Sequence, residues 1–66
     1  MEMNNLTQQD LGELLEKAVL IRESRSRTTQ NWRLPNGQLL SVYYYKSGRI
    51  EAVPISQEDT SLTVRY

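Results

Sequence analysis

Two glycine-containing turns do most to limit the folds that this chain of 66 residues can adopt. Residues 34–38 read LPNGQ and residues 45–49 read YKSGR. In both, glycine stands where a three-residue hairpin loop requires a left-handed backbone, and Pro35 supplies the fixed φ that a type I turn favours at its first central position. We therefore predict two successive hairpins, which together form a three-stranded antiparallel meander.

The length of these loops decides which side chains share a face of the meander. A three-residue loop pairs Leu34 with Gln38, whereas a two-residue Asn-Gly loop would pair Leu34 with Leu39 and exchange the two faces of the strand. We favour three-residue loops because both hairpins then agree on one nearly apolar face. The members of that face are Trp32, Leu34, Leu40, Val42, Tyr44, Ile50 and Ala52.

The segment before the turns begins with a helix-start signal. Thr7 as N-cap with Asp10 three residues later matches a capping box, and Leu6 and Leu11 have the spacing of a hydrophobic staple. Apolar residues then recur on one side at about 100° per residue as far as Ile21. These patterns predict an amphipathic helix that ends near Ser24.

Together, these elements predict an α+β fold in a single small domain. We expect the N-terminal helix over about residues 7–24, a polar linker over 25–29 and the sheet over about 30–66. The helix packs its apolar side on the meander and closes a two-layer core. Residues 61–66 alternate well enough for a further short strand, so we expect an antiparallel β-meander of three to four strands.

The composition argues against an enzyme. Cysteine and histidine are absent, which removes disulfides, thiol nucleophiles and the commonest ligands of transition metals. The sequence has no glycine-rich phosphate loop, nucleophile elbow or calcium loop. Its close carboxylate pairs, Glu13 with Glu16 and Glu58 with Asp59, fall at positions that we expect to be solvated, where nothing tunes a carboxylate for catalysis. We expect no catalytic residue, no metal and no cofactor.

The start of the chain bears on where the protein resides. Its first twenty residues contain four carboxylates and no long apolar run, a composition that argues against a signal peptide and a transmembrane span. Overall, 38% of the residues are hydrophobic and 24% are charged, which is typical of a globular protein. We therefore expect a cytoplasmic protein with no membrane partner.

Three consecutive tyrosines, Tyr43, Tyr44 and Tyr45, cannot all enter one core, because neighbouring side chains of a strand point to opposite faces. With Tyr44 inward beside Trp32, the other two lie on an outward face that a monomer would leave exposed to water. A contiguous group of exposed aromatic, aliphatic and arginine side chains often marks an interaction site. The alternative is that tyrosines paired with arginine or glutamate stabilise an exposed sheet face without any ligand.

The outward face gives the first functional hypothesis, a small non-enzymatic protein–protein interaction module that self-associates, for example as a homodimer. A chain of this size buries only about 60% of the surface that its unfolded form exposes, and a second copy would bury more. The expected partner-binding residues are Arg33, Leu39, Tyr43, Tyr45, Arg49 and Val53.

The second hypothesis is a nucleic-acid-binding regulatory protein. Four arginines, Arg22, Arg25, Arg27 and Arg33, fall within twelve residues, and a sheet that carries tyrosines can stack unpaired bases. However, the formal net charge is zero, and affinity for nucleic acid depends on phosphate neutralisation. A solvated linker whose arginines pair with nearby glutamates is the competing interpretation, and only a one-sided distribution of charge would favour nucleic acid.

Overall fold

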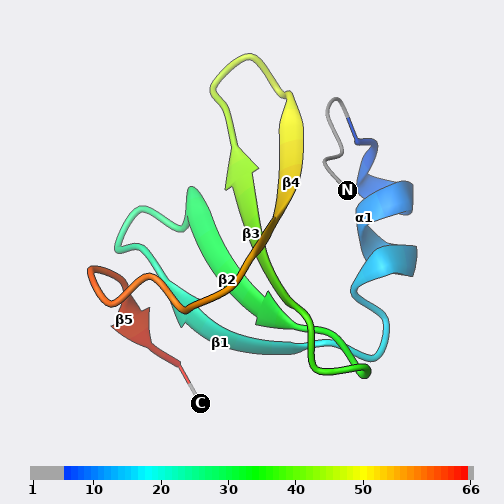
Figure 1. The fold of residues 1–66 in the computed structure, drawn as a ribbon. Helices are drawn as coiled ribbons and strands as arrows, with labels where there is room; N and C mark the ends of the chain where they lie inside the picture. Colours follow the sequence, from blue (N-terminus) through cyan, green and yellow to red (C-terminus); the bar gives the residue numbers. More distant parts are fainter. Residues whose placement is uncertain (1–5, 66) are drawn as a thin grey trace.

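The computed structural model describes residues 6–65, in which one helix accompanies a five-stranded antiparallel sheet (Figure 1). The strand order is β4-β3-β2-β1-β5. The α+β class is confirmed, whereas the expected number of three to four strands is wrong. The elements are α1 (Gln8–Leu14), β1 (Val19–Glu23), β2 (Thr29–Arg33), β3 (Leu39–Tyr44), β4 (Ile50–Ile55) and β5 (Thr63–Val64).

Helix α1 begins as its capping signal predicts. The Thr7 hydroxyl oxygen accepts a hydrogen bond from the Asp10 N–H at 3.0 Å, and the Asp10 carboxylate accepts one from the Thr7 N–H at 3.3 Å. These two bonds satisfy N–H groups that have no partner within the first turn of a helix. The capping box is therefore confirmed, with aspartate in the place of the commoner glutamate.

The expected extent of the helix is wrong, because α1 ends at Leu14 and residues 19–23 form strand β1. Val19 and Ile21 are β-branched and favour strands, and a short apolar run fits either period. Pairing decides the outcome, since β1 lies between β2 and β5 and uses backbone groups on both sides. The expected linker is a turn over residues 24–28, and β2 begins at Thr29.

Both glycine hairpins have the predicted three-residue loops. In residues 34–38 and again in residues 45–49, the N–H of the first residue donates to the carbonyl of the last at 2.9 Å. Gly37 and Gly48 have φ values of 91° and 93°, the left-handed conformation that glycine adopts at little cost. The register of the meander is therefore as predicted.

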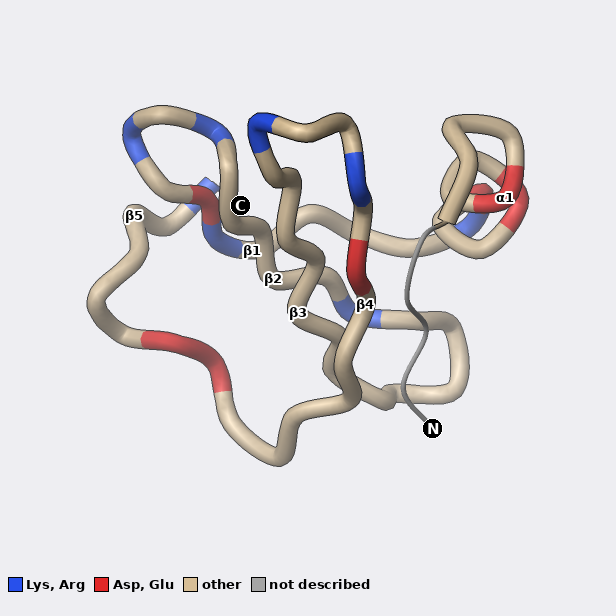
Figure 2. The backbone as a smooth tube through the Cα atoms, turned by 90° about the horizontal axis from the view of Figure 1, so that it is seen from above, with Lys and Arg blue, Asp and Glu red and all other residues tan. Residues whose placement is uncertain are grey.

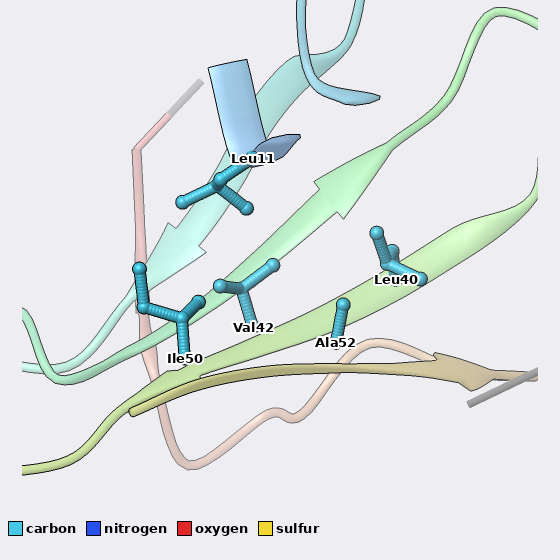
Figure 3. Close-up of a cluster of buried hydrophobic side chains, with 5 residues drawn as sticks. All are labelled: Leu11, Leu40, Val42, Ile50 and Ala52. Atoms are coloured by element: carbon cyan, nitrogen blue, oxygen red, sulfur yellow. The ribbon is translucent and has the colours of Figure 1, made fainter. Parts of the chain in front are cut away.

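A core lies between α1 and the two strands at one side of the sheet. Leu11 points from the helix toward Leu40 and Val42 of β3 and toward Ile50 and Ala52 of β4, and all five side chains are buried (Figure 3). Every member of the predicted apolar face belongs to this cluster or packs against it. The partly buried residues around the cluster are Leu6, Leu14, Leu15, Trp32, Leu34 and Tyr44.

The connection over residues 56–62 covers the middle of the opposite face of the sheet on its way from β4 to β5 (Figure 1). The Asp59 N–H donates to Asn31 Oδ1 at 2.7 Å, and Arg22 Nε donates to Glu58 Oε1 at 2.8 Å. Under the connection, Asn31 is 0% exposed and the neighbouring Ser41 is 2% exposed. The expectation of an outward face open to water is therefore wrong for its centre, which carries a second, polar layer.

Candidate functional site

The parity of the tyrosines is as predicted, with Tyr44 on the side of the sheet that faces α1. Its hydroxyl donates to Gln30 Oε1 at 3.1 Å, and the same oxygen accepts from Trp32 Nε1 at 3.0 Å. The amide nitrogen of Gln30 donates to Glu23 Oε2 at 2.7 Å. Burial raises the pKa of the Tyr44 hydroxyl above its usual range, and the negative charge of Glu23 raises it further. This network joins three strands and occupies the polar atoms of both aromatic side chains.

Tyr45 is 42% exposed and belongs to a small surface cluster at the β3–β4 turn. The Arg49 guanidinium lies over its ring, 4.6 Å from the centroid. Glu51 accepts from the Tyr45 hydroxyl at 3.3 Å and from Arg49 Nη2 at 3.3 Å. These contacts are the cross-strand pairing that stabilises an exposed face without a ligand. They also hold one aromatic ring and one cation in a defined arrangement at the surface.

The residues predicted to bind a protein partner fall into two groups. Tyr43 is paired with Glu51 toward the β3–β4 turn, whereas Leu39 is paired with Arg33 toward the opposite end of the sheet. Between them lies the pair of Ser41 with Val53, of which Ser41 is buried. The structure therefore brings Tyr43, Tyr45 and Arg49 together, leaves Val53 partly buried beside them, and separates Arg33 and Leu39 from the rest.

The four arginines predicted to bind nucleic acid do not form one surface. The side chain of Arg22 is 17% exposed and is held by Glu58 and by the carbonyl of Leu62 at 2.9 Å, so it fastens the 56–62 connection. Arg33 ends β2, about 13 Å along the strand from its first residue. Only Arg25 and Arg27 lie together, in the turn over residues 24–28.

Tertiary structure adds other basic residues to this pair. The turns over 24–28 and 45–49 lie side by side, and β5 starts at the same end of the sheet because Thr63 pairs with Glu23 (Figure 2). We call this the turn end. Within residues 6–65, it holds five of the eight basic residues but only two of the seven acidic residues. The basic residues are Arg25 and Arg27 of the first turn, Lys46 and Arg49 of the second, and Arg65, which approaches Glu23. The acidic residues are Glu23 and Glu51.

An open hollow of about 420 Å³ lies at the turn end, between the 24–28 turn and β5. The Glu23 carboxylate, whose side chain is 8% exposed, is 4.0 Å from Arg27 Nε and 3.7 Å from Arg65 Nε. Two guanidinium groups thus lie near one carboxylate. Because Arg25 also lines the hollow, three basic residues stand against one acidic residue there. The lining residues are Glu23, Ser24, Arg25, Arg27, Thr63 and Arg65.

Glu23 is one of the glutamates that the competing interpretation expected to pair with the linker arginines, and it lies 4.0 Å from Arg27. Arg65 was missed, because it was assigned only to a strand near the chain end. The signal that could have linked them is the alternating pattern of residues 61–66, which predicts a strand but does not name its neighbour. Only the pairing of β5 with β1 brings them together.

Metal-binding and membrane-spanning features are both missing from residues 6–65. This part of the chain has no group of three histidine, cysteine, aspartate or glutamate side chains placed to hold a metal ion. Its helix is too short to cross a membrane. A second, shallower hollow near the 34–38 turn is lined by Gly37, Gln38, Leu39, Pro54, Ile55 and Ser56, none of which carries a charge.

Comparisons of this chain with protein-family models, with curated proteins and with solved structures each found no match.

Proposed function

We propose that this protein is a non-enzymatic binding module that holds single-stranded nucleic acid at the turn end. The observation that supports this proposal is the one-sided distribution of charge (Figure 2). The formal net charge of zero hides an excess of three positive charges among the described residues of this end, which is five basic residues less two acidic ones. Phosphate groups respond to charge within about a Debye length, roughly 8–10 Å, so the local excess matters more than the sum over the chain.

The exposed ring of Tyr45 favours single strands over duplexes as the ligand. Unpaired bases stack on aromatic side chains, and each such contact is worth about 1–3 kcal/mol. The Tyr45 ring is already held by Arg49 and Glu51, so little side-chain entropy would be lost on binding. The molecule measures 26 × 26 × 18 Å, so its turn end has room for only a few nucleotides.

Salt dependence gives the first test. If three or four phosphates are neutralised, the slope of log K against log salt for a single strand is about −2 to −3. Raising the salt from about 50 to 200 mM should then weaken binding roughly 20- to 50-fold. Fluorescence anisotropy with a labelled oligothymidylate and with a mixed-sequence pool would measure this slope. Absence of binding even at low salt would reject the proposal.

A matched pair of variants tests the location. Arg25→Ala removes a cation at the turn end, and Arg33→Ala removes an exposed cation at the opposite end of the sheet. We expect the first variant to weaken binding several-fold and to lower the salt slope by about 0.7, the value for one phosphate contact. The second should bind like the wild type. Equal losses in both variants would place the ligand elsewhere.

The second candidate function is self-association as a homodimer. Strand β4 is an edge strand, and by the alternation of its ladder Ala52 points its N–H and C=O away from β3. Elsewhere along this edge, the Leu6 N–H donates to the Ile50 carbonyl at 3.0 Å. However, Ala52 is 0% exposed, so the centre of this edge is already covered. The surface open to a second copy is the one that carries Tyr43 and the exposed Tyr45.

Sedimentation equilibrium on the wild type and on the double variant Tyr43→Ser/Tyr45→Ser tests this second candidate. Self-association through the outward residues predicts a dimer for the wild type and a large loss of dimer for the variant. A wild type that stays monomeric at high concentration would reject it.

A further inference from the structure

The backbone of Arg27 is strained. Its φ is 61°, and it is the one non-glycine residue of the described chain with a positive φ. Residues other than glycine, asparagine and aspartate rarely adopt this conformation, because Cβ approaches the carbonyl oxygen. Such outliers persist where the surrounding structure determines them, and they gather at ligand-binding sites.

The other two hairpin turns of the sheet have glycine at the position that corresponds to Arg27, where a positive φ causes no strain. Arg27, Gly37 and Gly48 occupy corresponding positions from the start of each turn, since the N–H of each donates at 2.9 Å to the carbonyl three residues earlier. The turn with Arg27 is one residue longer, because the Ser24 N–H donates to the Thr29 carbonyl. All three have a positive φ. Two of the three turns use glycine there, and the third keeps a long cationic side chain.

The contacts that hold the 24–28 turn do not involve the Arg27 side chain. The hydroxyl oxygen of Ser24 accepts from the N–H groups of Thr28 and Thr29, each at 3.1 Å. The Arg27 side chain is 77% exposed, and its approach to Glu23, at 4.0 Å, exceeds hydrogen-bond distance. The turn therefore gains little from arginine at this position.

The strained backbone of Arg27 instead places the side chain of Arg27 at the hollow of the turn end. Glu23 is fixed there by the amide of Gln30 at 2.7 Å, and its other oxygen lies between Arg27 and Arg65. Because both distances exceed 3.5 Å, the guanidinium N–H groups remain available to a ligand. The three arginines and one glutamate that line the hollow leave two positive charges, which match a phosphate monoester of charge about −1.5 to −2 better than the single charge of a phosphodiester.

We propose that this hollow binds the terminal phosphate of a nucleic-acid strand, held between Arg27 and Arg65 with Arg25 at the rim. The inference rests on the proposed nucleic-acid function and names the part of the strand that the hollow takes. Arginine is suited to the role, because its planar fork donates two parallel hydrogen bonds to phosphate oxygens. Inorganic phosphate presents the same chemistry and serves as a probe of the hollow alone.

The test compares short oligothymidylates with a 5′-phosphate, with a 3′-phosphate and with neither. For the wild type, we expect one of the terminal phosphates to tighten binding about 10-fold, the effect of roughly one charge-assisted pair. Arg27→Gly and Arg65→Ala should abolish this difference, and Arg33→Ala should retain it. Equal affinity of the wild type for all three oligonucleotides would overturn the inference while leaving the proposed function intact.

Arg27→Gly also separates binding from folding. Glycine adopts the observed backbone without strain, so the midpoint of thermal unfolding should stay level or rise while the preference for a terminal phosphate disappears. If this midpoint falls with the preference, Arg27 has a structural role and the inference fails.

A last arm covers the case in which no oligonucleotide binds, which would reject the proposed function. A titration of the wild type with millimolar inorganic phosphate, monitored by ¹H–¹⁵N NMR, then tests whether the hollow binds phosphate. Saturable shifts at Arg27, Thr63 and Arg65 that vanish in Arg27→Gly would support an anion site. Absence of such shifts would overturn it.

Discussion

The fully buried Asn31 ties the connection between β4 and β5 to the sheet, so Asn31→Ala tests the polar layer directly. Asn31 Oδ1 accepts from the Asp59 N–H at 2.7 Å, and its Nδ2 donates to the Ser41 hydroxyl oxygen at 3.5 Å. Alanine removes the acceptor and leaves the Asp59 N–H without it. The variant should unfold more readily and should loosen residues 56–62 before the rest of the molecule.

The magnitude follows from these contacts. A buried donor without its partner costs about 1–3 kcal/mol, the 3.5 Å contact contributes little, and loss of amide packing adds about 1 kcal/mol. The total is about 2–4 kcal/mol. A chain of 66 residues has a free energy of unfolding of about 3–10 kcal/mol, so the loss is a large share. At about 4–8 °C per kcal/mol, we expect the unfolding midpoint to fall by about 8–32 °C.

Circular dichroism gives the midpoint, and hydrogen exchange of the Asp59 and Arg65 amides reports the local loosening. Gln57→Ala is the control, since Gln57 is an exposed residue of the same connection, and it should change stability by less than about 0.5 kcal/mol. A shift of less than about 3 °C for Asn31→Ala, with unchanged exchange at Asp59, would refute the reasoning.

Substitution by alanine should have opposite effects on stability at two glycines, as measured by urea titration. Gly12→Ala should stabilise the fold by about 0.5–1 kcal/mol, because Gly12 is in the helix and nothing lies within 4 Å of the added Cβ. Gly48→Ala should destabilise the fold by about 1–2 kcal/mol, because Gly48 has a φ of +93°. Tyr44 should ionise above the ordinary phenol pKa of 10.0, and ultraviolet titration of the phenol would show this. The stability that the raised pKa contributes is therefore fully present below pH 10.0 and is lost as the pH rises through the pKa of the folded state. The side-chain and backbone hydrogen bonds from Ser61 lower the pKa of Asp59 below 3.8, so its contribution is present above 3.8 and is lost as pH falls through the lowered value. Ser61→Ala should return the pKa of Asp59 toward 3.8 in carboxyl-carbon NMR, and an unchanged pKa would contradict this assignment.

Local patterns predicted the parts of the fold that depend on neighbours in the chain. The capping box of Thr7 and Asp10, the left-handed glycines and the inward position of Tyr44 follow from rules that operate over a few residues. The extent of the helix did not, because residues 19–23 are apolar enough for either period and their strand is stabilised by partners on both sides.

The candidate site was less predictable than the fold. Arg25 and Arg27 were named together and remain together, but Arg22 holds the connection and Arg33 lies at the opposite end of the sheet. Arg65 joins the pair only because β5 returns to the far side of β1. The positions of charged residues along the sequence do not predict that these arginines lie together, because antiparallel strands bring turns that are distant in the sequence to the same end of the sheet.

What the sequence determined by itself is the register of the β2–β3–β4 meander and the identity of its buried face. Turn geometry and the two-residue period of a strand act over a few residues, so they can be read without knowledge of distant contacts. Only the tertiary structure decided which structure residues 15–24 adopt, that β5 pairs with β1, and that five basic residues gather at the turn end. These depend on which backbone groups find partners far along the chain, and the free energy of that pairing exceeds the small local preferences that opposed it.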